Sequence, residues 1–242
     1  SYLWKKLTQR ANRIITISEF SKAEIIKYLG FSESLVDVIP LGVDARYFEQ
    51  VTETEKQITL RALGIDSPFF LFIGSIQPRK NLTRLLSAHA RLPRSLAKQY
   101  PLVIAGKLAW DDGSTLSAIE KAVNAGTAKC LDYITENQKK CLLQSALGLT
   151  FTSLYEGFGL PITEAFASGL PVITSNCTSM PEVAGDAALI VDPLNTHQMT
   201  EALLGLIEDT GLAQTLKDRG LERSKLFSWK TNADKTRSIY RC

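Results

Sequence analysis

The sequence predicts an α/β protein built on a doubly wound parallel sheet. Short apolar runs alternate along the chain with longer amphipathic stretches, which is the pattern of repeated strand–helix units. The run from Phe69 to Ile73 is apolar throughout, as expected of a central parallel strand that is covered on both faces. Glycine-containing turns follow this run and the run from Leu149 to Thr152. Ligands of such sheets bind beyond the carboxyl ends of the strands, so these two turns are the first places to look for a site.

Strands are predicted wherever short apolar segments rich in β-branched residues are bounded by turn residues. Each is too short for a helix and is followed by a segment of helical periodicity. In chain order the expected strands are residues 13–18, 36–40, 69–73, 102–105, 131–134, 149–152, 172–174 and 188–191.

Helices are predicted from capping residues and from apolar spacing. Ser21 with Glu24, and Asn195 with Gln198, have the spacing of a capping box. Gly30 suits the end of the first of these helices. The expected helices are residues 21–30, 52–64, 81–92, 117–125, 136–146, 161–169, 195–207, 212–226 and 230–240.

Composition narrows the functional classes. The net charge of +3 is small and evenly spread, which argues against nucleic-acid binding. No apolar run approaches the roughly 20 residues of a membrane-spanning helix. The four cysteines lack C-x-x-C spacing and fit reduced thiols in a cytoplasmic protein: Cys130, Cys141, Cys177 and Cys242. A basic cluster near the start suits a solvated helix face, with peripheral contact at the inner face of the membrane as the alternative: Lys5, Lys6, Arg10 and Arg13.

The first site motif is Glu-Gly-Phe-Gly-Leu-Pro-Ile-Thr-Glu, from Glu156 to Glu164. Gly157 and Gly159 permit a sharp bend after the preceding strand, and Pro161 suits the first turn of a helix. The unpaired N–H groups and the positive end of the helix dipole favour a bound anion. With a turn between them, both carboxylates can face one ligand. A structural turn with two surface carboxylates is the alternative interpretation of this motif taken by itself.

The second site motif is Gly-Ser-Ile-Gln-Pro-Arg-Lys-Asn, from Gly74 to Asn81, directly after the central strand. Gly74 lets the backbone approach a ligand where the strand ends. Arg79 and Lys80 place two positive charges just before a helix, where they oppose the helix dipole. A bound phosphate would offset this cost, because a charge-assisted hydrogen bond contributes about 1.5–3 kcal/mol. Two solvated basic residues in a loop are the alternative.

Together the two motifs resemble the retaining GT-B glycosyltransferases of family 4, also called group 1. The resemblance extends over nearly the whole chain and keeps the order usual in that family. It includes the segments Thr16–Ser18, Val38–Asp44, Pro171–Thr174, Pro181–Asp186 and Phe227–Trp229. The resemblance implies the donor-binding half of a GT-B enzyme, with a Rossmann-like fold.

The resemblance also implies roles for individual residues. Arg79 and Lys80 would bind the donor diphosphate and stabilise the charge that develops as it leaves. Glu156 would lie at the reacting centre, and Glu164 would accept hydrogen bonds from the nucleotide ribose. The remaining substrate contacts are expected through the main chain, at the strand exit, around the base and at the sugar or phosphates: Gly74, Tyr133, Ile134, Gly157, Phe158, Gly159 and Leu160.

The family pattern begins only near the end of its first domain. The resemblance therefore implies that residues 1–45 are the tail of the acceptor domain with the interdomain connection, and that residues 46–242 are the donor domain. The enzyme is expected to transfer a hexose with retention, without a metal or other cofactor, and this part alone is expected to be inactive. Mannose from GDP-mannose is the expected donor, with other hexoses and UDP as alternatives. The acceptor is expected to be a glycan or lipid-linked glycan of surface polysaccharide or lipopolysaccharide.

Other functions fit the sequence less well. A dehydrogenase would need a G-x-G-x-x-G fingerprint after a strand, which is missing. A sugar-nucleotide epimerase of GT-B fold, or a nucleotide-binding module without its own activity, remains as an alternative. His89 and His197 are expected to be non-catalytic, and Asp111 and Asp112 to be turn residues.

Overall fold

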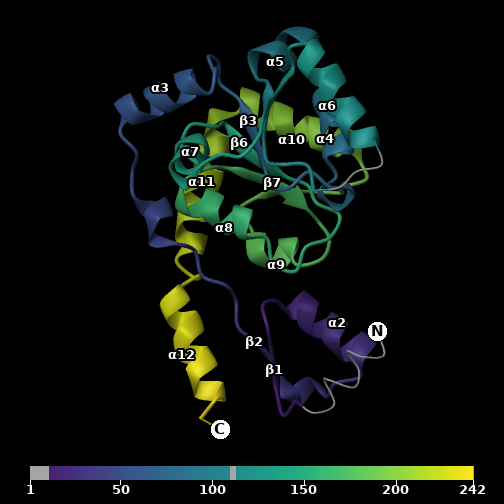
Figure 1. Cartoon of the computed structure of the whole chain (residues 1–242), viewed down its shortest axis with the longest axis vertical. Helices are drawn as coiled ribbons and strands as arrows, with labels where there is room; N and C mark the ends of the chain where they lie inside the picture. The colour runs from purple at the N-terminus through teal and green to yellow at the C-terminus, as the bar shows by residue number, and fades with distance from the viewer. Residues whose placement is uncertain (1–10, 110–112, 242) are drawn as a thin grey trace.

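The computed structural model describes residues 11–109 and 113–241, and its centre is a six-stranded parallel sheet (Figure 1). The strands lie in the order β5–β4–β3–β6–β7–β8, so the direction of winding reverses between β3 and β6. Their bounds are β3 (Phe70–Ile73), β4 (Leu102–Ala105), β5 (Ala128–Leu131), β6 (Gly148–Phe151), β7 (Val172–Ser175) and β8 (Leu189–Val191). The doubly wound parallel sheet predicted from the sequence is confirmed.

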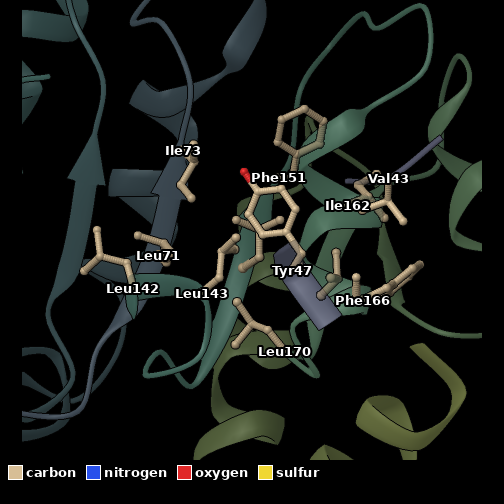
Figure 2. Close-up of a cluster of buried hydrophobic side chains, with 14 of the residues drawn as sticks. Val43, Tyr47, Leu71, Ile73, Leu142, Leu143, Phe151, Ile162, Phe166 and Leu170 are labelled. Atoms are coloured by element: carbon tan, nitrogen blue, oxygen red, sulfur yellow. The ribbon is translucent and has the colours of Figure 1, made fainter. Parts of the chain in front are cut away.

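Helices cover both faces of this sheet (Figure 1). Because side chains alternate along a strand, Leu71 and Ile73 of β3 enter one apolar cluster and Phe70 and Phe72 enter the other. Figure 2 shows the first cluster, in which the Tyr47 ring lies near the middle of the group and Phe151 lies above it. The helices are α3 (Glu53–Ala62), α4 (Leu82–His89), α5 (Arg94–Gln99), α6 (Ser114–Asn124), α7 (Glu136–Leu143), α8 (Leu160–Ala167), α9 (Met180–Ala184), α10 (Thr196–Glu208), α11 (Thr210–Ser224) and α12 (Trp229–Ile239).

The N-terminal segment, residues 11–40, lies apart from the six-stranded sheet in the lower part of Figure 1. It holds a two-stranded parallel sheet of β1 (Ile14–Thr16) and β2 (Val36–Val38), joined by α2 (Glu19–Leu29). On its other side α12 contacts the chain that leaves β2, since Asn232 Nδ2 donates to Pro40 O over 2.8 Å. The chain then enters the main body near the short turn Ala45–Phe48.

The predicted start of α2 was wrong. Ser18, not Ser21, is the N-cap: it has extended backbone angles (φ −156°, ψ 156°), and its hydroxyl accepts the Ser21 N–H over 3.0 Å. Ser21 already lies inside the helix, so the predicted capping box of Ser21 with Glu24 does not form. The predicted end is confirmed, because Gly30 is the C-cap with a left-handed φ of 72°.

Two further predictions differ in detail. The strand expected at residues 131–134 is β5 at Ala128–Leu131, because its polar residues Lys129 and Cys130 are tolerated at the edge of the sheet. Asn195 caps α10 as predicted, but Gln198 accepts from the Asp192 N–H and forms no box with Asn195. Helices α5 and α9 were not predicted; both are short.

Some predictions fall outside the described residues: Lys5, Lys6, Arg10, Asp111, Asp112 and Cys242. Within the described part of the chain, no helix combines the length and the hydropathy that crossing a bilayer requires.

Candidate functional site

The two site motifs meet where the winding of the sheet reverses. The chain leaving β3 forms the short 3₁₀ turn Pro78–Lys80, and the chain leaving the adjacent β6 leads to Glu156. A backbone hydrogen bond of 2.7 Å from Leu154 N to Arg79 O joins the two segments. Asn81 follows the turn in a left-handed conformation with φ 60°, and its side-chain amide donates to Thr152 O over 3.1 Å. The two loops are thus tied together at the edge where a ligand is expected.

Arg79, Lys80 and Glu156 form one ionic cluster. Lys80 Nζ lies 2.7 Å from Glu156 Oε1, and Arg79 Nη1 lies 2.8 Å from the same oxygen. Arg79 Nη1 also donates to Tyr155 O over 3.0 Å. The Lys80 and Glu156 side chains are only 8% and 11% exposed, whereas that of Arg79 is 41% exposed. The structure therefore brings together the three residues for which a catalytic role was expected; the roles themselves stay a prediction.

Burial shapes the charge of Lys80. Its ammonium group lies 4.6 Å from the centre of the Phe151 ring, and its stem lies against the Gly74 backbone. Burial lowers the Lys80 pKa below its ordinary value, and the hydrogen bond with Glu156 acts in the opposite direction by favouring the charged form. Two cations and one carboxylate leave the cluster with an excess positive charge, which suits an anionic ligand.

The glycine loop, residues 156–159, leads into α8 as the sequence predicted. Gly159 has φ 107°, helix α8 begins at Leu160, and Pro161 lies in its first turn. No hydrogen bond within the described residues uses the backbone N–H groups of Gly157, Phe158, Gly159 or Leu160. Several donors at a helix start are thus available to a ligand.

Glu164 belongs to a different ion pair. Its Oε1 lies 2.7 Å from Lys139 Nζ of α7, and both side chains are largely buried. Burial raises the Glu164 pKa, although the positive charge and the hydrogen bond of Lys139 act to lower it. Glu164 Oε2 is buried without a hydrogen-bond partner. A buried carboxylate oxygen without a donor is costly, and a hydroxyl group of a ligand would satisfy it.

A cavity of about 340 Å³ lies beyond the ends of β3, β4 and β5, and Gly74, Gly106 and Ile134 line it. Gly106 has φ 157°, and a Cβ there would overlap the Gly74 carbonyl group. Tyr133 also lines the cavity; the residue is 73% exposed, and its ring centroid lies 5.6 Å from Lys107 Nζ. Ile134, for which a contact with the nucleotide base was expected, thus lies at this cavity; its role stays a prediction.

The two histidines lie outside the ionic cluster. His89 is buried in α4 with Nε2 2.8 Å from Tyr100 O, and His197 is exposed beside Glu201. Within residues 11–109 and 113–241, no three His, Cys, Asp or Glu side chains gather in a way that could hold a metal ion.

Two models of known protein families match the sequence of this chain. A family model described as "Glycosyl transferases group 1" matches residues 55–223, and another described as "Glycosyltransferase Family 4" matches residues 1–47. The chain belongs to the group 1 glycosyl transferases. This confirms the family predicted from the two motifs.

Three proteins similar to this glycosyl transferase chain are informative. The O-antigen chain mannosyltransferase B of Escherichia coli is 32% identical over 231 residues, which are 96% of this chain and 61% of that protein. The structure of sucrose-phosphate synthase from Thermosynechococcus elongatus has a TM-score of 0.83 at 26% identity, over 99% of this chain and 60% of that one. The Anabaena protein HepE, solved in complex with UDP-glucose, has a TM-score of 0.87 at 18% identity, over 100% of this chain and 67% of that one. The likeness confirms the GT-B type of fold, and this chain spans about three fifths of the first two proteins.

Several residues at the candidate site were not predicted from the sequence. Lys139 pairs with Glu164, and Ser179 contacts two carbonyl groups of the glycine loop. Thr178 has φ 56°, and its hydroxyl accepts the Glu156 N–H over 3.2 Å. The position of Lys139 in the sequence gives no indication that it pairs with Glu164. Thr178 and Ser179 could have been found, because they follow the carboxyl end of β7, where ligands of such sheets bind.

Proposed function

We propose that this chain is the donor-binding part of a hexosyltransferase that moves mannose from GDP-mannose to a glycan or lipid-linked acceptor. Membership of the glycosyl transferase family supports the reaction class. The mannosyltransferase activity in the name of the Escherichia coli relative supports the sugar, and the O-antigen in that name supports an acceptor in surface polysaccharide or lipopolysaccharide synthesis. The ionic cluster at the reversal of the sheet is the observation that carries the proposal.

The donor diphosphate would bind at Arg79 and Lys80. Both cations lie at the end of β3, opposite the unpaired N–H groups of the glycine loop, so cationic and backbone donors converge on one region. The nucleotide would extend toward the cavity beside Ile134, and its ribose hydroxyl groups would donate to Glu164. UDP-glucose in the complex of the HepE relative supports a nucleotide-sugar donor of this general kind.

Transfer would proceed with retention and without a metal or other cofactor. Lys80 and Arg79 would supply the positive charge that stabilises the departing diphosphate, and they are already fixed before the reaction. Glu156 would lie beside the transferred sugar, where its carboxylate holds both cations in position. These roles follow the family resemblance, and the ionic cluster supports them.

We further propose that residues 1–45 are the end of the acceptor-binding domain with its connection, and that residues 46–242 are the donor domain. The separate position of β1, α2 and β2 supports this division. A cytoplasmic protein, with at most peripheral contact at the membrane, fits the use of a nucleotide-sugar donor.

Thermal stabilisation by a panel of nucleotide sugars tests the donor. We expect the largest shift in Tm with GDP-mannose and GDP, and smaller shifts with the UDP-, ADP- and dTDP-sugars, because at equal concentration a ligand with a lower Kd stabilises the folded state more. A larger shift with UDP-glucose than with GDP-mannose would contradict the proposed donor but not the reaction class.

A transfer assay with the full-length protein tests the reaction class. Formation of a mannosylated acceptor supports the proposal. Conversion of the nucleotide sugar to its epimer would instead indicate an epimerase, and binding without any turnover would indicate a nucleotide-binding module.

A further inference from the structure

The Ser179 hydroxyl group, in the main body, holds two carbonyl groups of the glycine loop. Ser179 Oγ lies 2.9 Å from Glu156 O and 3.0 Å from Phe158 O, so it shares one proton between two acceptors. Ser179 is fully buried at the start of α9. The carbonyl groups of Glu156 and Phe158, which belong to the peptide groups 156–157 and 158–159, therefore have fixed directions.

The carbonyl group between them is held by the N-terminal segment. Gly157 O accepts from Ser18 Oγ over 2.7 Å and from Ser21 Oγ over 3.2 Å. Both serines lie at the start of α2, more than 130 residues earlier in the chain. One turn of the N-terminal segment is thus bonded directly to the loop that carries the ligand-facing amides.

These bonds fix the direction of backbone donors. In a trans peptide group the C=O and N–H bonds point in opposite directions, and the described residues contain no cis peptide bond. Holding the Gly157 carbonyl group toward α2 turns the Phe158 N–H away from α2. Since that N–H has no acceptor among the described residues, its direction sets where a ligand can be bound.

The start of α2 is itself held in place by the main body. The Glu182 carboxylate of α9 accepts the backbone N–H of Glu19 over 2.9 Å and that of Phe20 over 3.2 Å. The Phe20 ring contacts the Tyr155 ring edge to face, with centroids 5.4 Å apart. A carboxylate at a helix N-terminus is favourable, so Glu182 fixes the end of α2 that carries the two serines.

We propose that Ser18 and Ser21 are positioning residues for donor binding. By holding the Gly157 carbonyl group they orient the Phe158 N–H toward the diphosphate-bearing donor, so the N-terminal segment completes a site that otherwise belongs to the main body. This inference rests on the proposed function for the identity of the ligand. Beyond the proposed function, the inference states that donor affinity depends on two residues outside the donor domain, Ser18 and Ser21.

The test removes both hydroxyl groups at a small cost to the stability of α2. Ser18→Gly combined with Ser21→Ala is suitable, because glycine at an N-cap costs only a few tenths of a kcal/mol relative to serine. In the 242-residue chain we expect the Kd for GDP and UDP, measured by calorimetry, to rise about fivefold, the effect of one neutral hydrogen bond. Ser18→Thr with Ser21 intact keeps the hydroxyl donor and should restore the affinity.

Two further measurements separate positioning from general destabilisation. The Kd values for the nucleosides guanosine and uridine, which lack phosphate, should not change. NMR relaxation of the unliganded protein should show increased motion of the Gly157 and Phe158 amides in the double variant. Ser32→Ala is the matched control, since the hydroxyl group of this exposed serine of the same segment hydrogen-bonds only to the Ser34 hydroxyl group among the described residues.

Unchanged diphosphate affinity together with unchanged motion of the loop amides in the double variant would overturn the inference. An equal loss of affinity for nucleosides and diphosphates would also overturn it, because the effect would then not act on the phosphates. If the unsubstituted chain binds neither GDP nor UDP, the proposed function fails. The relaxation measurement then still decides whether the two serines hold the loop.

Discussion

Replacing Lys80 by methionine tests whether the buried ammonium group binds the donor diphosphate. Lys80 Nζ lies 2.7 Å from Glu156 Oε1, and the side chain is 8% exposed between the Gly74 backbone and the Phe151 ring. Methionine nearly keeps the length and the apolar packing of the lysine stem. The substitution therefore removes the charge and little else.

The expected loss of affinity follows from the bonds that the ammonium group would make. A hydrogen bond from a charged donor to phosphate contributes about 1.5–3 kcal/mol, which corresponds to a rise in Kd of roughly 10-fold to 150-fold. Breaking a buried ion pair costs about 3–5 kcal/mol of folding stability when the remaining charge has no partner. Arg79 stays 2.8 Å from the same Glu156 oxygen, so we expect the loss of stability to lie below about 3 kcal/mol.

Calorimetric titration with GDP and UDP measures the affinity, and urea unfolding measures the stability. Lys140→Met is the matched control, because Lys140 Nζ forms a similar pair with Glu49 over 3.0 Å and its side chain is 15% exposed. We expect the control to bind both diphosphates with wild-type affinity. If folded Lys80→Met also binds both with wild-type affinity, the ammonium group does not contact the diphosphate and the reasoning is refuted.

Four further substitutions concern the neighbouring residues. Arg79→Ala should raise the Kd for GDP less than Lys80→Met does, since Arg79 is 41% exposed; an equal or larger rise in the same titration would contradict this. Glu156→Gln should lower turnover of the full-length enzyme strongly while the Kd for GDP stays equal or falls, so a raised Kd with normal turnover would count against its role. Glu164→Gln should raise the Kd for GDP. In the wild type the raised Glu164 pKa means that the native state keeps a proton on Glu164 at a pH where the unfolded state has lost it. The wild type therefore loses stability as the pH rises above 4.5 and Glu164 ionises, whereas Glu164→Gln does not, so the variant should gain stability relative to the wild type in urea unfolding. A stability difference that instead shifts toward the wild type with rising pH would contradict this. Gly106→Ala should lower the Tm, since its Cβ would overlap the Gly74 carbonyl group and its φ of 157° suits glycine; an unchanged Tm would show that the two strand ends move apart freely.

The sheet and the ionic cluster could be predicted because each follows from local sequence. The run at β3 is apolar on both faces, and a turn with two cations follows it directly. The same holds for β6 and the glycine loop. Once both strands are parallel and adjacent, their carboxyl ends must lie together, so the meeting of the two motifs follows; the ion pair of Lys80 with Glu156 was not predicted.

Other features depend on packing between distant segments and could not be predicted. The cap of α2 was predicted at Ser21, whereas the extended backbone and the side-chain bond at Ser18 make Ser18 the N-cap. Lys139 comes from α7 and reaches Glu164 of α8 through the contact of two helices. The bond from Ser18 to Gly157 joins the N-terminal segment to the glycine loop, and no spacing in the sequence indicates it.

The charge balance of the cluster explains why Glu156→Gln should act in opposite directions on stability and binding. Without a ligand, Arg79 and Lys80 lie within 2.8 Å of one carboxylate oxygen, which offsets the repulsion between the two cations. A bound diphosphate would take over that function, so the carboxylate and the ligand compete for the same donors. Removing the negative charge should therefore destabilise the unliganded protein and free both cations for the donor. If the variant loses diphosphate affinity instead, Glu156 acts mainly by holding the cations in place, and the competition is not the dominant effect.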